Sequence, residues 1–157
     1  MSVFTTTVVP PLGAELPGLA RRWTQAEFTE RHEVTYGPGR IVPEAWPEHN
    51  LHSDPEAAAR EGLSAPIASA PQLISMVHRQ MLACFGMGWL AGGTIDVKMI
   101  KPVFVDDLTT AKGRVTGIAL ETDATGAEVR RVTCEVWVER LGGQKVLVGT
   151  ASGLLRD

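Results

Sequence analysis

The segment from Ser69 to Phe85 has a helical pattern whose apolar side chains surround almost the whole circumference. Ser69-Ala70-Pro71-Gln72 has the spacing of a capping box, and Gly86 follows the last apolar position. The apolar positions between them are Leu73, Ile74, Met76, Val77, Met81, Leu82, Ala83 and Phe85. A helix of this kind cannot lie on a surface, because it would leave an apolar face in water. We therefore expect one long helix buried on most sides, with His78 as a hydrogen-bonded core residue.

The chain after this helix is patterned for strands. Four segments alternate apolar and polar residues: Thr94–Ile100, Leu108–Leu120, Val129–Arg140 and Lys145–Leu155. Turn sequences lie at residues 123–126 and 141–144, so the last three strands are expected to form an antiparallel meander. A long central helix wrapped by a curved antiparallel sheet is an α+β architecture, the hotdog arrangement.

Two shorter helices are expected before the long one. Thr24 and Glu27 have capping-box spacing and predict a helix that runs to about Val34. Residues 37–53 are rich in proline, glycine and polar groups and are expected to form a loop. Asp54 precedes Pro55 in the order typical of an N-cap, and Gly62 is expected to end the short helix that follows.

Length and charge exclude several classes of protein. The 157 residues are expected to form one domain over 1–157, and the net charge of −3 argues against nucleic acid or an anionic membrane as partner. No apolar run approaches the roughly 20 residues that span a bilayer. The N-terminal residues lack a signal-peptide pattern, so we expect a cytoplasmic protein. Cys84 and Cys134 are expected to be buried free thiols.

The segment from Trp46 to Pro55 gathers side chains that can move protons or bind metals. They are Glu48, His49, Asn50, His52 and Asp54. His52 is the first candidate for general acid/base catalysis, because a histidine near its neutral pKa can share protons with a carboxylate. The alternative is a loop histidine that only bonds a backbone carbonyl. We expect Asp54 to act as a structural cap and His49 to lie on the surface.

The same side chains are possible metal ligands. However, Pro47, Asn50 and Pro55 prevent one helix from presenting His49 and His52 together, and no further cluster of histidine or cysteine completes a site. We therefore expect no metal.

The run Asn50 to Ala58, with Gly62-Leu63 and Pro66-Ile67-Ala68, resembles the signature of the MaoC-like dehydratase and (R)-specific enoyl-CoA hydratase family, whose fold is the hotdog. The strand sequences at 98–103 and 149–151 are similar to that family too, and the resemblance covers about residues 45–155. It implies a hydro-lyase of fatty acid metabolism that hydrates 2-enoyl thioesters reversibly. It also implies acyl-CoA or acyl-carrier substrates, a homodimer or higher homo-oligomer, and no cofactor.

The family signature also has an acid/base aspartate five residues before its histidine, and this chain departs from it there. The residue at that position is Pro47, which cannot carry a proton. If the loop is one residue shorter than in the family, Glu48 stands at the aspartate position and becomes the second catalytic candidate. Glu44 is another carboxylate that the loop could bring near.

The start of the long helix supplies candidate substrate contacts. Backbone N–H groups there, aided by the helix dipole, can bind the oxyanion of a thioester enolate. The family commonly has a His-Gly step where this chain has Ser69-Ala70, and Pro71 has no N–H, so Ala70 is the expected donor with Ser69 beside it. The alternative is an ordinary helix cap.

Other substrate contacts are expected from the loop and from aromatic residues. Asn50 is expected to orient the substrate or His52. Trp46 and Trp89 are candidates for lining an acyl pocket, with core or dimer packing as the alternative. Lys98 and Lys101 are either contacts for coenzyme A phosphates or parts of a solvated strand face.

Three functions follow from these residues. The first is hydration or dehydration of acyl thioesters. The second is another reaction on the same enolate-stabilising pocket, either a Michael-type addition, an isomerisation or a thioester hydrolysis. The third is a non-catalytic subunit that binds acyl ligands.

Overall fold

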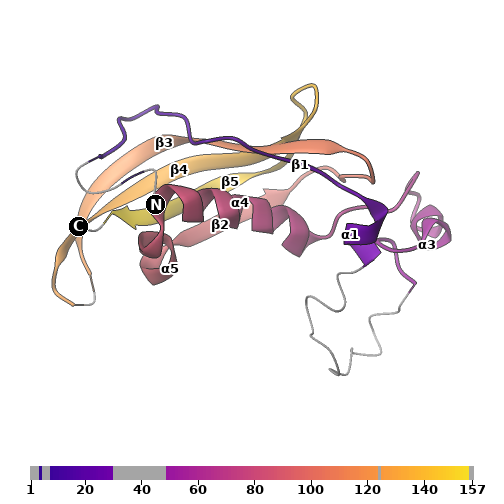
Figure 1. Cartoon of the computed structure of the whole chain (residues 1–157), viewed down its shortest axis with the longest axis horizontal. Helices are drawn as coiled ribbons and strands as arrows, with labels where there is room; N and C mark the ends of the chain where they lie inside the picture. The colour runs from indigo at the N-terminus through magenta and orange to yellow at the C-terminus, as the bar shows by residue number, and fades with distance from the viewer. Residues whose placement is uncertain (1–3, 5–7, 30–48, 124, 156–157) are drawn as a thin grey trace.

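The computed structural model describes residue 4 and residues 8–29, 49–123 and 125–155. Five strands form one antiparallel sheet in the order β1-β3-β4-β5-β2. The strands are β1 (Leu19–Arg22), β2 (Thr94–Met99), β3 (Leu108–Thr122), β4 (Glu128–Arg140) and β5 (Lys145–Leu155), and the helices are α1 (Gln25–Thr29), α3 (Pro55–Arg60), α4 (Ala70–Phe85) and α5 (Met87–Gly92). Figure 1 shows the sheet curving over α4, with α1 and α3 beyond the N-terminal end of that helix.

The long helix α4 matches the expected position and length. Ser69 is its N-cap, and Gly86 ends it with a φ of 53°, a left-handed conformation that glycine adopts without strain. Gly153 of β5 lets the helix approach the sheet, because a Cβ there would lie 2.4 Å from the ring of Phe85. The helix and the sheet therefore pack directly, with no room for a side chain at this point.

The expectation that α4 is buried on most sides was wrong for its outer face. Leu73, Met76, Val77 and Met81 are buried against the sheet. Leu82 is 44% exposed, and the expected core residue His78 is also exposed, with its ring edge against Trp89 at 5.3 Å between ring centroids. The reason is that the sheet covers only one side of the helix.

The predicted meander of β3, β4 and β5 is confirmed. A bulge shifts the β3–β4 register between Val115 and Gly117. The sequence did not indicate β1 or α5, which are four and six residues long. Strand β1 pairs with β3 at one edge of the sheet, and β2 pairs with β5 at the other edge.

The short helix α1 has a capped start and follows a residue that is bonded to the sheet. The backbone N–H of Thr24 donates to Glu27 at 2.8 Å, as the capping-box spacing predicts. The indole N–H of Trp23 donates to the hydroxyl of Thr109 on β3 at 2.8 Å, and both residues are fully buried. The predicted end of this helix near Val34 lies outside the described residues.

The core lies between α4 and the concave face of the sheet. Both cysteines are buried free thiols in it, as the sequence predicts. Burial raises the pKa of Cys84 to about 11 and, with the added charge of Cys84, that of Cys134 to about 12. No helix in the described part of the chain is long and apolar enough to cross a membrane.

Candidate active site

The loop that carries His52 is held by its own backbone and by Asn50. The carbonyl of Asn50 accepts hydrogen bonds from the N–H groups of Ser53 at 3.0 Å and Asp54 at 2.9 Å. The side-chain oxygen of Asn50 accepts from the backbone N–H of His52 at 2.9 Å. Asn50 therefore orients His52 through the backbone.

The ring of His52 is fixed by a backbone carbonyl. Its Nδ1 lies 2.8 Å from the carbonyl oxygen of Ile67, and the N–H of Ile67 donates to the carbonyl of Leu51 at 3.2 Å. A carbonyl oxygen only accepts, so Nδ1 carries the proton. In the neutral ring the lone pair then resides on Nε2, which is the nitrogen that can accept a proton.

Asp54 occupies the predicted N-cap of α3. Its carboxylate accepts from the backbone N–H groups of Glu56 at 2.7 Å and Ala57 at 3.4 Å, with Pro55 at the first helical turn. His49 is largely exposed and lies 3.6 Å from the Asp54 carboxylate. Asp54 therefore stabilises the end of the loop where α3 begins.

The N-terminus of α4 begins beside this loop. Ser69 is 2% exposed, and its N–H and hydroxyl both donate to Oε1 of Gln72, at 2.8 and 3.0 Å. The Ala70 N–H has no hydrogen-bond partner among the described residues. It is one of the N–H groups that a helix leaves unsatisfied at its start, where the helix dipole favours negative charge.

A cavity of about 500 Å³ is lined both by the loop that carries His52 and by the start of α4. His52 and Ala70 both line it, and most of the other lining residues are apolar, among them Leu51, Leu63, Leu73 and Val103. Lys101 lies at its exposed side. The cavity is thus lined by one histidine, by the first residue of α4 and by mostly apolar side chains. These groups can bind an acyl chain and move a proton at one end of it.

The site residues predicted from the sequence fall into three groups: those that line the cavity, those behind it, and those outside the described residues. His52 and Ala70 lie together in the cavity, while Asn50 and Ser69 lie directly behind them without lining it. Trp46 and Glu48, with Glu44, lie outside the described residues. Among described residues, no three histidine, cysteine, aspartate or glutamate side chains gather where they could hold a metal ion.

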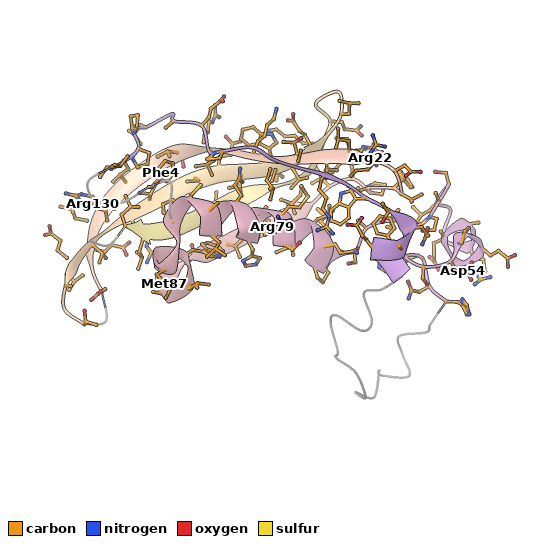
Figure 2. All side chains as sticks on the ribbon, viewed as in Figure 1. Phe4, Arg22, Asp54, Arg79, Met87 and Arg130 are labelled. Carbon is orange, nitrogen blue, oxygen red and sulfur yellow. The ribbon has the colours of Figure 1, made fainter. Side chains whose placement is uncertain are left out.

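Trp89 does not line this cavity. It lies on α5, beyond the far end of the 16-residue helix α4, where it is 8% exposed and packs against His78. At 1.5 Å per residue, α4 alone separates that end from Ala70 by roughly 20 Å. Figure 2 shows Asp54 and Met87 toward opposite ends of the molecule, which mark the loop and α5.

Sequence reasoning missed three residues that organise the site. Ile67 acts through its backbone carbonyl, which no pattern of side chains reveals. Gln25 donates to the carbonyl oxygens of His52 and Ser53, each at 3.4 Å. Gln72 was visible as part of a capping box, but its second bond, to the carbonyl of Glu27 at 2.8 Å, joins segments 45 residues apart. Such a contact cannot be predicted from local spacing.

No protein-family model matches the chain, and no curated protein matches it in sequence. Solved structures do match it. A structure of an (R)-hydratase from A. caviae involved in PHA biosynthesis has 22% identity and a TM-score of 0.63, and the match covers 94% of this chain and 98% of that one. A MaoC-like dehydratase from Rhodospirillum rubrum has 17% identity and a TM-score of 0.66, with 93% and 92% covered.

A third match is a structure of the ChsH1–ChsH2 complex from Mycobacterium tuberculosis. It has 16% identity and a TM-score of 0.69, and the match covers 95% of this chain and 100% of that one. All three matches span nearly the full length of both chains at low identity. The chain therefore has the hotdog fold of MaoC-like dehydratases and (R)-hydratases.

Proposed function

We propose that this protein is an enzyme that adds water to 2-enoyl thioesters and removes it from 3-hydroxyacyl thioesters. The observation that carries the proposal is the cavity that His52 and Ala70 both line together with mostly apolar residues. An acyl thioester needs these three elements: a surface for its chain, a base for water, and a donor for its carbonyl oxygen. The fold matches to an (R)-hydratase and a MaoC-like dehydratase support the same reaction.

His52 is the proposed general base and acid. Its Nε2 takes a proton from water as the water oxygen bonds to C3 of the enoyl group. The electron pair of the C2–C3 double bond moves onto the thioester carbonyl to form an enolate. The proton then returns to C2 as the enolate collapses, so the reaction is balanced by water alone. The bond from Nδ1 to Ile67 supports this role, because it keeps Nε2 unprotonated in the neutral ring.

The proposed oxyanion donor is the Ala70 N–H. Negative charge develops on the thioester oxygen only during the reaction, so a donor already fixed at a helix N-terminus stabilises the transition state more than the substrate. Glu48 is proposed as the carboxylate partner of His52, and Trp46 as a wall of the substrate site; both proposals rest on sequence position alone. Lys101, at the exposed side of the cavity, is proposed to face the anionic carrier of the thioester.

The reaction is tested with crotonyl-CoA. Loss of the enoyl absorbance together with formation of 3-hydroxybutyryl-CoA is the expected result. Release of free thiol, detected with a thiol reagent, would instead identify a thioesterase. Thermal stabilisation by the thioester without any turnover would identify a non-catalytic acyl-binding subunit. Either of these two outcomes would overturn the hydratase assignment.

We further propose that two copies associate through strand β2. In the described part of the chain β2 pairs only with β5, so its other edge is open. If two copies pair antiparallel about Val97, Asp96 of one lies opposite Lys98 of the other, and both side chains are exposed on the same face. Registers centred on Asp96 or on Lys98 would each place two like charges opposite one another. The charge pattern of this strand thus favours self-pairing in one register.

Charge exchange tests this dimer by sedimentation equilibrium. Lys98→Asp and Asp96→Lys each place like charges opposite one another and are expected to weaken the dimer. The double exchange, Asp96→Lys with Lys98→Asp, restores opposite charges and is expected to restore the dimer. A wild-type monomer, or a dimer that neither single exchange weakens, would contradict pairing through β2.

A further inference from the structure

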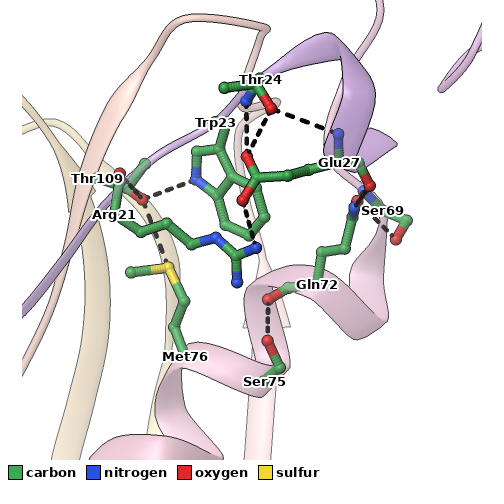
Figure 3. A network of polar contacts seen from close by, with 9 residues as sticks. All are labelled: Arg21, Trp23, Thr24, Glu27, Ser69, Gln72, Ser75, Met76 and Thr109. Atoms are coloured by element: carbon green, nitrogen blue, oxygen red, sulfur yellow. Dashed lines mark hydrogen bonds and ion pairs between the residues drawn. The ribbon is translucent and has the colours of Figure 1, made fainter. Parts of the chain in front are cut away.

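The side chain of Gln72 joins the first turn of α4 to helix α1. Its Oε1 accepts from the N–H and the hydroxyl of Ser69, and its Nε2 donates to the carbonyl oxygen of Glu27 at 2.8 Å. Figure 3 shows Gln72 between Ser69 and Glu27. Both ends of the amide are therefore used, and the Ser69–Ala70 step has a fixed position relative to α1.

Helix α1 also contacts the other half of the candidate site. The side chain of Gln25 donates to the carbonyl oxygens of His52 and Ser53, at 3.4 Å each. Gln25 and Glu27 are two residues apart on one short helix. The helix therefore bridges the loop that carries His52 and the turn that carries the Ala70 N–H.

The bridging helix is itself firmly held. Glu27 accepts hydrogen bonds from Thr24 and from Arg21, the latter at 2.6 Å. Burial opposes the charged form of Glu27, but these hydrogen bonds outweigh it and lower the pKa of its carboxyl group. Trp23, two residues before α1, donates its indole N–H to Thr109, and this buried bond holds the start of the helix to the sheet.

We propose that Gln72 is a positioning residue that, by way of α1, helps to fix the position of the Ala70 N–H relative to His52. This proposal rests on the proposed function of the same site. Its physical basis is the steep dependence of catalysis on geometry, because a displacement of about 1 Å can cost on the order of 100-fold in rate. His52 contacts Ile67, two residues before Ser69, and the bridge of Gln72, α1 and Gln25 is a second connection between the two segments.

Three variants separate positioning from simple stability. Gln72→Ala removes all of the bonds of the Gln72 side chain. Gln72→Glu keeps a carboxylate oxygen for Ser69 but loses the donor to Glu27, and a negative charge at a helix N-terminus helps to preserve the fold. Ser75→Ala is the matched control, because the Ser75 hydroxyl bonds only the carbonyl of Gln72, within the same helix, at 2.6 Å.

The first measurement is steady-state hydration of crotonyl-CoA. Both Gln72 variants are expected to lose about 10- to 100-fold in kcat, because a displacement of about 1 Å can cost on the order of 100-fold in rate. KM is expected to stay near that of the wild type, because the cavity walls are unchanged. Ser75→Ala is expected to keep the wild-type kcat. Wild-type kcat in Gln72→Glu, or a loss that follows the drop in thermal stability across all three variants, would overturn the proposal.

The second measurement is amide hydrogen exchange, which needs no activity. In Gln72→Glu, residues 50–53 are expected to exchange faster while Ser69 stays protected; in Gln72→Ala, both are expected to exchange faster. Ser75→Ala is expected to alter neither. A wild-type protein that does not hydrate the thioester would overturn the proposed function, and exchange at residues 50–53 would still decide on positioning. Unchanged exchange there in both Gln72 variants would overturn the bridge.

Discussion

The carbonyl oxygen of Ile67 lies 2.8 Å from Nδ1 of His52, and this contact fixes both the orientation and the tautomer of the ring. Sequence reasoning offered two alternatives for His52, a catalytic base or a loop histidine bonded to a backbone carbonyl. In the structure His52 does bond a backbone carbonyl. This bond is compatible with a role as catalytic base. A ring held at Nδ1 keeps the lone pair of the neutral ring on Nε2, the nitrogen that a general base needs.

Removal of the α3 cap is expected to weaken the loop that carries His52. Asp54→Ala leaves the N–H groups of Glu56 and Ala57 without their acceptor, which costs about 1 kcal/mol in the free energy of unfolding. Urea denaturation measures the change. Glu56→Ala is the control, because its exposed side chain lies on the same helix without capping it, and an equal loss in both variants would contradict the cap.

Loss of the Thr109 hydroxyl is expected to lower the free energy of unfolding more than loss of the Asp54 cap does. Thr109→Val keeps the shape of the side chain but leaves the indole N–H of Trp23 buried without an acceptor, a penalty of about 1–3 kcal/mol. Denaturation experiments test this against Thr116→Val, which removes an exposed hydroxyl from the same strand. Similar stabilities of the two variants would show that the Trp23–Thr109 bond does not hold α1 to the sheet.

The contribution of Glu27 is expected to depend on pH. Its pKa is lowered in the folded protein from the ordinary value of 4.5, because hydrogen bonds from Arg21 and Thr24 outweigh burial. The stabilisation is therefore complete above about pH 4.5 and is lost as the pH falls through the lower, folded-state pKa. Wild type is expected to be more stable than Glu27→Gln at pH 7, with the difference shrinking below pH 4.5. A difference that stays constant down to pH 3 would contradict this account.

Much of the fold could be predicted because its signals are local. The length of α4, its cap at Ser69 and the stop at Gly86 follow from residue spacing, and the three meander strands follow from alternation and turns. The cap at Asp54 follows from its place before Pro55. Each of these depends on neighbours within a few residues, which is the range that a sequence pattern reports.

The rest depends on contacts between distant segments. The four residues of β1 do not show an alternation long enough to predict a strand. They form one because they pair with β3, about 90 positions later. The exposure of His78 depends on which side of α4 the sheet covers. The number of apolar residues in the helix does not identify that side. The distance of Trp89 from the cavity likewise depends on tertiary structure, because α4 lies between Ala70 and the helix that carries Trp89.

The most direct test of the central claim compares hydration of crotonyl-CoA by His52→Gln and by His49→Gln. Both substitutions replace an imidazole in the same loop, but only His52 lines the cavity, and His49 is exposed. Loss of a general base is expected to lower kcat by about 100- to 10,000-fold in His52→Gln. His49→Gln is expected to keep the wild-type rate. Wild-type kcat in His52→Gln would contradict the assignment of His52 as the catalytic base.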